Sequence, residues 1–414
     1  MRNAGAVVGV VLFLATASVG ASPLGRWVTT WAAAPAPSAE AMGPFPASPH
    51  FANQTLRQAM RISVGGAHLR VRLTNEYGAH ALTIGAAHVA LLDAHGDAQP
   101  GTDRVLSFNA QPTARIPAGA PLVSDPVDLA VPDLATLEVS LYLPEETGPC
   151  TCHPAAMQSM LVSAEGNFVG QHFPAAQTLP TRAFVAAVEV ENAHAAGTIV
   201  TFGDSITDGV GSTPDANHRW PDRLAERLAA AHRGPYGIAN AGISGNQLLS
   251  DGAGQAALVR FDRDVLAVPG AKYVVILEGI NDIGLSYGVA TGPFADYFRK
   301  SKPAKPVTAD DLIGAYGQLI ARAHSKGLKV IGATLTPYKG ALYYAPEGEA
   351  IRAAVNKWIR TGGAFDGVID FDAVMRDPTD PTQIADGLHP GDHLHGTDKG
   401  YQAMAGAIAL SLFN

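Results

Sequence analysis

The chain has 414 residues, a length that suggests two or three domains of about 100–200 residues each. Hydrophobic residues make up 47% and charged residues 16%, a composition that supports packed cores and excludes wholesale disorder. The formal charge is -8 and no Lys/Arg-rich run occurs, which argues against a nucleic acid as partner because such proteins need a basic face.

The N-terminus has the pattern of a secretory signal peptide. Arg2 supplies a positive start, and the run from Ala6 to Ala15 is apolar apart from Gly9. Small residues lead to a cleavage position after Ala21. We therefore expect residues 1–21 to be removed and the protein to be secreted or periplasmic, with a retained N-terminal anchor as the alternative. No later segment has the roughly 18 consecutive apolar residues of a membrane helix.

The only cysteines are Cys150 and Cys152, followed by His153. An exported protein can keep a disulfide, but a bridge across one residue closes a very small ring, so the pairing stays open. Two thiolates and one histidine are one ligand short of a structural zinc site. We expect no metal and treat the cluster as a local loop feature.

Residues 22–192 have the pattern of a β-domain. Hydrophobic residues alternate at positions 60, 62 and 64 and again at 69, 71 and 73, which predicts a hairpin turning at Gly65-Gly66. Further strand-like runs lie at 82–92, 105–108, 126–129 and 137–143. Many short strands predict a jelly-roll-like β-sandwich. Possible ligand-facing residues, for which a structural role is the more common one, are Trp27, Trp31, His153 and Gln158.

Residues 193–197 read as a linker, and residues 198–414 as an α/β domain. Strand-like runs at 199–202, 238–241, 273–277, 329–334 and 367–371 alternate with helix-like segments at 220–231, 310–326, 347–361 and 399–412. This alternation predicts a parallel sheet with right-handed crossovers. Thr308 and Asp311 form a candidate capping box. Residues 286–306, rich in Gly, Pro and Lys, are expected to form a loop near the site.

Four motifs follow strands of this domain, where a parallel sheet gathers reactive groups at one edge. They are Gly203-Asp204-Ser205, the glycine-rich loop around Gly245, Asn281 after an apolar strand, and Asp392-His393-Leu394-His395. Together they supply what acyl transfer needs. A serine is activated by a histidine, the histidine is oriented by a carboxylate, and donors stabilise the oxyanion, each contributing about 2.7–4 kcal/mol.

The four motifs, in this order over about residues 199–405, resemble those of the SGNH (GDSL) hydrolase superfamily. The resemblance implies a three-layer flavodoxin-like domain that needs no metal or organic cofactor. It implies that Ser205 is the nucleophile and that Ser205, Gly245 and Asn281 form the oxyanion hole. It further implies that His395 is the general base and that Asp392 orients it.

The tail contains a second Asp-x-x-His unit, Asp386 to His389, beside Asp392 to His395. In the family, Gly-Tyr commonly follows the catalytic histidine by five and six residues, and His395 meets this spacing with Gly400-Tyr401. His389 has instead the proline that often follows the family histidine. The spacing favours His395.

Two acidic residues close to Ser205 in the sequence are expected to have structural roles and not catalytic ones. Asp204 and Asp208 are expected to hold the nucleophile turn through hydrogen bonds to the backbone.

The β-domain placed before an SGNH domain resembles secreted bacterial enzymes related to xylan esterases. The first hypothesis is therefore an exported esterase whose partner is a small-molecule or polysaccharide ester, with acetyl or other short acyl groups on carbohydrates. The second is a lipase or lysophospholipase with a long acyl pocket. The third is a glycan-binding protein without activity.

Overall fold

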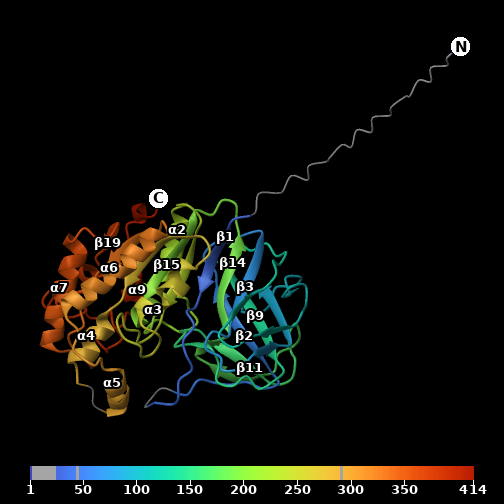
Figure 1. Ribbon diagram of the computed structural model, residues 1–414, viewed down its shortest axis with the longest axis horizontal. Helices are drawn as coiled ribbons and strands as arrows, with labels where there is room; N and C mark the ends of the chain where they lie inside the picture. The colour runs from blue at the N-terminus through green and yellow to red at the C-terminus, as the bar shows by residue number, and fades with distance from the viewer. Residues whose placement is uncertain (2–24, 43–45, 290–291) are drawn as a thin grey trace.

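The computed structural model describes residues 1, 25–42, 46–289 and 292–414. The expected signal peptide, residues 1–21, lies outside this part of the chain except for Met1. Two halves stand side by side in Figure 1: a β-rich N-terminal half in blue to green and an α/β half in yellow-green to red. Within the described residues, no helix is both long enough and apolar enough to cross a membrane.

The N-terminal half is built mainly from two antiparallel sheets, as expected for a β-sandwich. The first sheet has the order β1 (Trp27–Ala32), β14 (Val185–Glu191), β3 (His68–Thr74), β8 (Pro121–Val123). The second has the order β12 (Ala175–Leu179), β11 (Met160–Glu165), β2 (Gln54–Arg61), β9 (Thr136–Leu143), β5 (Ala86–Leu91), β6 (Arg104–Val105). Two short pairs are β4 (Leu82–Ile84) with β7 (Ala114–Ile116) and β10 (Cys152–Pro154) with β13 (Thr181–Ala183). The run at 126–129 forms one isolated bridge, Leu69 to Val127.

The predicted hairpin at Gly65-Gly66 is wrong. Strand β2 pairs with β9 and β11, whereas β3 pairs with β14 and β8 in the other sheet. The two glycines form backbone hydrogen bonds to a distant segment instead. The Gly65 N–H donates to Asp133 over 2.6 Å, and the Gly66 N–H donates to the Val131 carbonyl over 3.0 Å. The alternating residues are buried as expected, but alternation defines which face is buried and not which strand is the partner.

The C-terminal half contains one parallel sheet of five strands. Its order is β16 (Tyr236–Gly242), β15 (Gly197–Gly203), β17 (Ala271–Leu277), β18 (Lys329–Ala333), β19 (Gly367–Ile369). Counted within this half, the order is 2-1-3-4-5, the flavodoxin-like arrangement. Every pair is parallel, and the interior strand β15 is buried along its whole length. The expected fold class is therefore confirmed.

The helices of this half pack in two groups, α2, α8 and α9 in one and α3, α4, α6 and α7 in the other. Each longer helix buries an apolar stripe, as α6 does with Leu312, Tyr316 and Leu319. The bounds are α1 Ser205–Asp208, α2 Trp220–Ala230, α3 Ala257–Phe261, η1 Asp262–Leu266, α4 Ile280–Tyr287, η2 Gly292–Phe294, α5 Ala295–Ser301, α6 Ala309–Ser325, α7 Pro346–Thr361, α8 Phe371–Met375, α9 Asp398–Ala407 and η3 Leu410–Leu412.

The segment expected to be a loop, residues 286–306, contains the helix α5. The glycines and prolines on either side led to the prediction of a loop. Between them, the residues Ala295–Ser301 are able to form a helix. Immediately after it, the predicted capping box is confirmed, because Thr308 accepts from the Asp311 N–H and Asp311 accepts from the Thr308 N–H.

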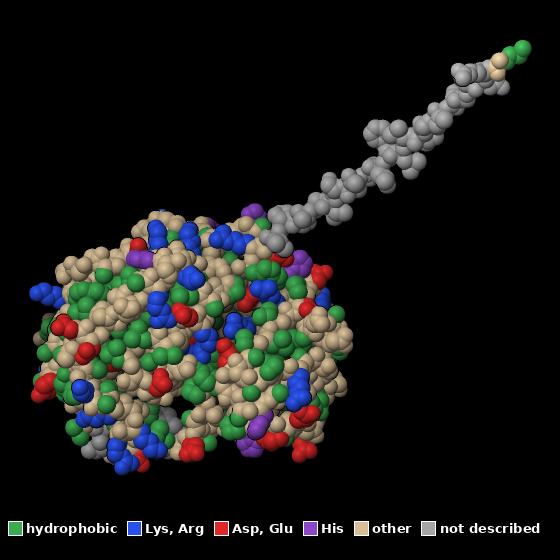
Figure 2. Space-filling view, in the orientation of Figure 1, with side chains coloured by type: hydrophobic (Ala, Val, Ile, Leu, Met, Phe, Trp, Pro, Cys, Tyr) green, Lys and Arg blue, Asp and Glu red, His purple; other side chains and the backbone are tan. Residues whose placement is uncertain are grey.

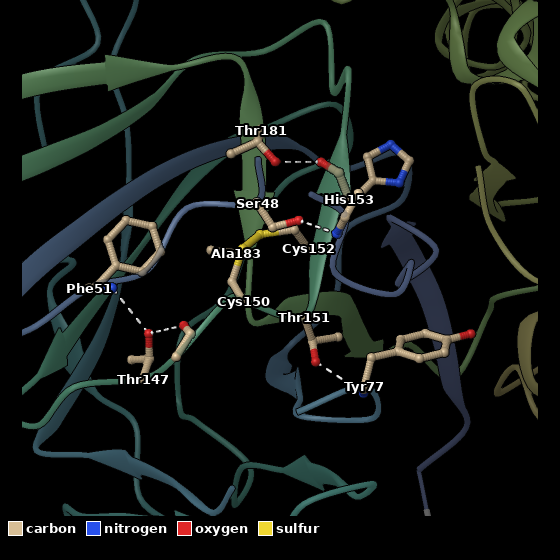
Figure 3. Close-up of a disulfide and its surroundings, with 12 residues drawn as sticks. Ser48, Phe51, Tyr77, Thr147, Cys150, Thr151, Cys152, His153, Thr181 and Ala183 are labelled. Atoms are coloured by element: carbon tan, nitrogen blue, oxygen red, sulfur yellow. Dashed lines mark hydrogen bonds between the residues drawn. A yellow bond between two sulfur atoms is a disulfide. The ribbon is translucent and has the colours of Figure 1, made fainter. Parts of the chain in front are cut away.

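A disulfide joins Cys150 and Cys152, which settles a pairing that the sequence left open. Figure 3 shows that Thr151, between them, accepts from the Tyr77 N–H over 3.0 Å, and that His153 follows Cys152 on β10. Both cysteines are buried. The bridge thus lies at the start of β10, the strand that carries His153 toward the other half.

The two halves are joined by hydrogen bonds and ion pairs. Ser63 accepts from the Ile238 N–H over 2.7 Å, and Arg61 pairs with Glu226 over 2.7 Å. The first contact links the β-rich half to the parallel sheet and the second links it to α2. On the face drawn in Figure 2, acidic and basic side chains are interspersed.

Candidate active site

Three neighbouring strands of the parallel sheet end at one level. Gly203 at the end of β15 is in register with Gly242 of β16 and Leu277 of β17. Ser205 follows the first of these strand ends by two residues. Gly245 follows the second by three and Asn281 follows the third by four. Three of the predicted site residues are therefore delivered to the same edge of the sheet.

The turn that carries Ser205 is tightly packed. A Cβ at Gly203 would lie 2.2 Å from the Leu277 carbonyl oxygen, so the neighbouring strand leaves no room for a side chain. Asp204 caps α1 by accepting from the Ile206 N–H over 2.9 Å. This confirms the backbone-holding role expected for Asp204. Ser205 then begins the helix with only 6% of its surface exposed.

A chain of hydrogen bonds links Ser205 to the C-terminal tail. Ser205 Oγ lies 2.9 Å from His395 Nε2, and His395 Nδ1 lies 2.6 Å from Asp392 Oδ2. Asp392 Oδ1 accepts from the backbone N–H groups of Leu394 and His395. Burial opposes ionisation of Asp392, but the hydrogen bond and charge of His395 outweigh it and lower the carboxyl pKa to about 2. Asp392 is therefore a carboxylate at any ordinary pH.

The competing His389 lies elsewhere in the tail. Its Nδ1 accepts from the N–H groups of Gly391 and His393, and its ring centroid lies 4.2 Å from that of His393. Burial and His393 lower the His389 pKa. Over the described residues, His389 has no hydrogen bond to Ser205. The geometry brings His395, and not His389, to the serine.

The predicted oxyanion donors lie on interlocked loops. Asn281 Nδ2 donates to the Asn246 carbonyl over 2.9 Å, while Asn281 Oδ1 accepts from the Tyr343 hydroxyl over 3.2 Å. These two bonds orient the amide and leave one of its N–H groups for a ligand. Gly245 has a φ of 77°, a conformation that favours glycine. In the described part of the chain, the N–H groups of Ser205 and Gly245 have no hydrogen-bond acceptor.

Asp282 anchors the loop after Gly245. Its two carboxylate oxygens accept from the N–H groups of Leu248 and Leu249 over 2.7 and 2.9 Å. Burial raises the Asp282 pKa to about 6, although the two backbone bonds oppose the rise. Asp282, which follows Asn281 directly, thus fixes the loop of the second motif against the third.

Arg260 joins two of the three strand ends to the loop after β16 and was not identified from the sequence. Its guanidinium donates to the carbonyls of Gly203 and Ala241 and to Asn246 Oδ1, over 2.7 to 2.9 Å. It also pairs with Asp264 over 3.0 Å. The sequence offers no local signal for these contacts, because the acceptors lie 14 to 57 residues away.

Two further acids near the serine are buried. Burial raises the pKa of Asp204 to about 7, despite its backbone bond to Ile206. Burial and the neighbouring Asp204 raise the pKa of Glu278 well above its usual value, although Arg260 opposes the rise. Glu278 Oε2 lies 3.6 Å from the Arg260 guanidinium. Burial thus disfavours the ionised form of both carboxyl groups at the base of the site.

The β-rich half contributes His153 to the support of the serine helix. His153 Nδ1 donates to the Ala34 carbonyl and Nε2 to Asp208 Oδ1, both over 2.9 Å. Asp208 Oδ2 accepts from the N–H and hydroxyl of Ser244, next to Gly245. Asp208 therefore holds the glycine loop rather than its own turn. Two donating ring nitrogens require an imidazolium; burial disfavours it, but Asp208 raises the His153 pKa.

Within the described residues, no group of three or more His, Cys, Asp or Glu side chains is arranged to hold a metal ion. The site consists of a serine, a histidine, a carboxylate and polarised N–H groups. Such an arrangement can transfer an acyl group by nucleophilic attack.

Residues 201–403 match the GDSL-like Lipase/Acylhydrolase family. The matched residues form a GDSL-like lipase/acylhydrolase domain in the C-terminal half, as the resemblance of the motifs predicted, and the expected class of enzyme, an ester hydrolase, is that of this family. Curated proteins gave no match.

Similar solved structures include a putative acylhydrolase from Bacteroides fragilis NCTC 9343, 20% identical, with a TM-score of 0.37 and coverage of 52% of this chain and 86% of that one. A lipase/acylhydrolase from Enterococcus faecalis is 20% identical, with a TM-score of 0.38 and coverage of 52% and 93%. An acetyl xylan esterase is 20% identical, with a TM-score of 0.37 and coverage of 51% and 96%.

Proposed function

We propose that the protein hydrolyses carboxylic esters through an acyl-enzyme on Ser205. The observation that carries the proposal is the chain from Ser205 Oγ through His395 to Asp392, with steps of 2.9 and 2.6 Å. His395 Nε2 takes the hydroxyl proton as Ser205 Oγ attacks the acyl carbon. His395 then returns that proton to the leaving alcohol. Water, deprotonated by the same nitrogen, releases the acid and restores Ser205.

The negative charge of each tetrahedral intermediate is assigned to three donors: the N–H groups of Ser205 and Gly245 and the free amide N–H of Asn281. These donors are held before substrate arrives, because Asn281 is fixed by Tyr343 and by the Asn246 carbonyl. Donors that need no reorganisation lower the barrier most effectively. Asp392 stays ionised and stabilises the imidazolium that forms on His395.

The acyl group is proposed to be short, chiefly acetyl, and carried on a carbohydrate. Tyr297 on α5 supports the short acyl group, since a Cβ at Gly245 would lie only 2.4 Å from its hydroxyl oxygen. Little space is left beside that oxyanion donor. The carbohydrate part of the proposal rests on the resemblance of the two-part chain to secreted bacterial xylan esterases.

Hydrolysis of p-nitrophenyl esters of increasing acyl length tests this function. The expected order places acetate first, with a steep decline at longer chains because Tyr297 limits the acyl space. Acetylated xylan should release acetate, and Ser205→Ala should remove both activities. A preference for long acyl chains would point instead to a lipase or lysophospholipase. Absence of ester hydrolysis by the wild-type chain would indicate a glycan-binding protein.

Export is part of the proposal. The apolar leader and the Cys150–Cys152 disulfide both suit an oxidising compartment outside the cytoplasm. N-terminal sequencing of protein recovered from the culture medium or periplasm should begin at Ser22, after cleavage behind Ala21. Recovery of a chain that still begins at Met1 would contradict the assignment.

A further inference from the structure

A cavity lies between the two halves of the chain, and Asp208 at the end of α1 is among its lining residues. It has about 620 Å³ of empty space, counted together with its opening to solvent. Trp31, His153 and Arg182 line it from the β-rich half, and Arg219 and Asp222 line it from the N-terminal end of α2. Neither Ser205 nor Asn281 is among the lining residues. The cavity is therefore a separate place in the fold.

Arg182 is an unusual side chain in this cavity. It lies on β13 with 2% of its surface exposed, yet its Nη1 has no hydrogen-bond partner among the described residues. Its one described side-chain contact is with Trp31, whose ring centroid lies 5.2 Å from the guanidinium carbon. A buried guanidinium is normally paired, because removing an unpaired charge from water costs several kcal/mol.

The other cations around the cavity already have partners. Arg61 pairs with Glu226 over 2.7 Å and Arg219 with Asp222 over 3.0 Å. His153 pairs with Asp208 over 2.9 Å. These pairs are locally neutral, so the guanidinium of Arg182 is the positive charge left uncompensated among the cavity-lining residues described.

The surroundings of Arg182 also disfavour the ionised form of its side chain. Burial and the charge of Arg219 lower its pKa to about 9, and the more distant Asp215 only partly compensates. An anion placed beside the guanidinium would reverse both effects. Without such an anion, the protein thus has a buried guanidinium with no counter-ion, beside a polar cavity with room for a ligand.

We infer that this cavity binds a small carboxylate, held by the guanidinium of Arg182. One uncompensated positive charge calls for one negative charge, whereas sulfate or phosphate would bring excess charge near Asp208 and Asp222. Trp31 faces the guanidinium, and the planar fork of an arginine matches a carboxylate with two parallel hydrogen bonds. The apolar surface of Trp31 and neighbouring alanines suits the carbon part of such a ligand.

Isothermal titration of acetate into the wild-type protein, at constant ionic strength and pH 7, tests the inference. We expect saturable binding of one acetate with millimolar affinity. Arg182→Met should weaken binding at least about tenfold, the effect of losing a charge-assisted pair. Arg182→Lys keeps the charge without the fork and should give an intermediate loss, which separates a ligand role from a folding defect.

Two control variants locate the site. Arg70 also lies over a tryptophan, Trp27, but it is paired with Glu189, so Arg70→Met should leave acetate binding unchanged. Asn281→Ala should also leave it unchanged, because that side chain belongs to the ester site. Loss of binding in Asn281→Ala, with retention in Arg182→Met, would place acetate at the ester site and overturn the inference.

Two further outcomes would also overturn it. Wild-type protein that shows no saturable acetate binding would have no such site. Sulfate that binds as tightly as acetate would contradict the assignment to a carboxylate. Neither outcome bears on ester hydrolysis by Ser205, which is measured independently.

Discussion

His395→Ala should reduce ester hydrolysis by about four orders of magnitude or more, to the level left by binding and oxyanion stabilisation alone. His395 Nε2 lies 2.9 Å from Ser205 Oγ, so the variant removes the group that accepts the serine proton. His389→Ala should retain most of the activity, since His389 bonds to its own loop through Gly391 and His393.

The comparison is made by measuring kcat/KM on p-nitrophenyl acetate for both variants under the same conditions. Circular dichroism and thermal unfolding of each variant provide the control for folding. Loss of activity in His389→Ala alone would reverse the assignment. Equal, small losses in both variants would mean that neither histidine is the general base.

The pH profile provides a second measurement on the same residues. The Asp392 pKa is lowered to about 2, so this carboxylate stays charged through the acid range where the enzyme is measurable. A fall in rate on the acid side should therefore come from the general base and not from Asp392, because a protonated base cannot accept the serine proton. The stability that Asp392 contributes when ionised is present above about pH 4, its unfolded pKa, and is lost as pH falls toward 2. A rate that stays flat through the histidine range would contradict a histidine base.

The arrangement of the candidate site follows from the sequence because parallel strands place their carboxyl ends at one edge. Ser205, Gly245 and Asn281 each come two to four residues after an apolar run, and the sheet order 2-1-3 makes those runs neighbours. The Gly-Tyr spacing after His395 likewise favoured the histidine that the structure brings to Ser205. These are local patterns, and the sheet converts them into proximity.

Contacts between segments far apart in the chain have no such local pattern in the sequence, so they were not predicted. The alternation around Gly65-Gly66 indicated buried faces but not that the chain crosses to another sheet. His153 and Asp208 lie 55 residues apart and belong to different halves, so neither predicts the other. The cavity beside Arg182 is lined by both halves, so the sequence of neither half predicts it. Pairings of this kind depend on tertiary packing, which a single sequence does not specify.

Arg260→Met should lower the free energy of unfolding by about 3–5 kcal/mol, the range observed when one member of a buried ion pair is removed. The guanidinium is 1% exposed and donates to the strand-end carbonyls of Gly203 and Ala241. Methionine fills much of the volume but removes a donor from each carbonyl, although Gly203 keeps the Ile243 N–H. It also leaves buried Asp264 with only Arg263 as partner. Unsatisfied buried groups, rather than a cavity, account for the loss.

Urea unfolding measures this effect, and Arg322→Met is its matched control. Both guanidiniums lie over a phenylalanine ring, Arg260 at 4.1 Å from Phe202 and Arg322 at 5.2 Å from Phe261. Arg322 differs in pairing at the surface with Asp262, so its loss should be at most about 1 kcal/mol. Equal losses in the two variants would mean that the ring contact, and not the link between strand ends, makes Arg260 important.

Arg260 also bonds Asn246, whose carbonyl orients Asn281. The kcat of the folded Arg260→Met variant should therefore fall while KM changes little.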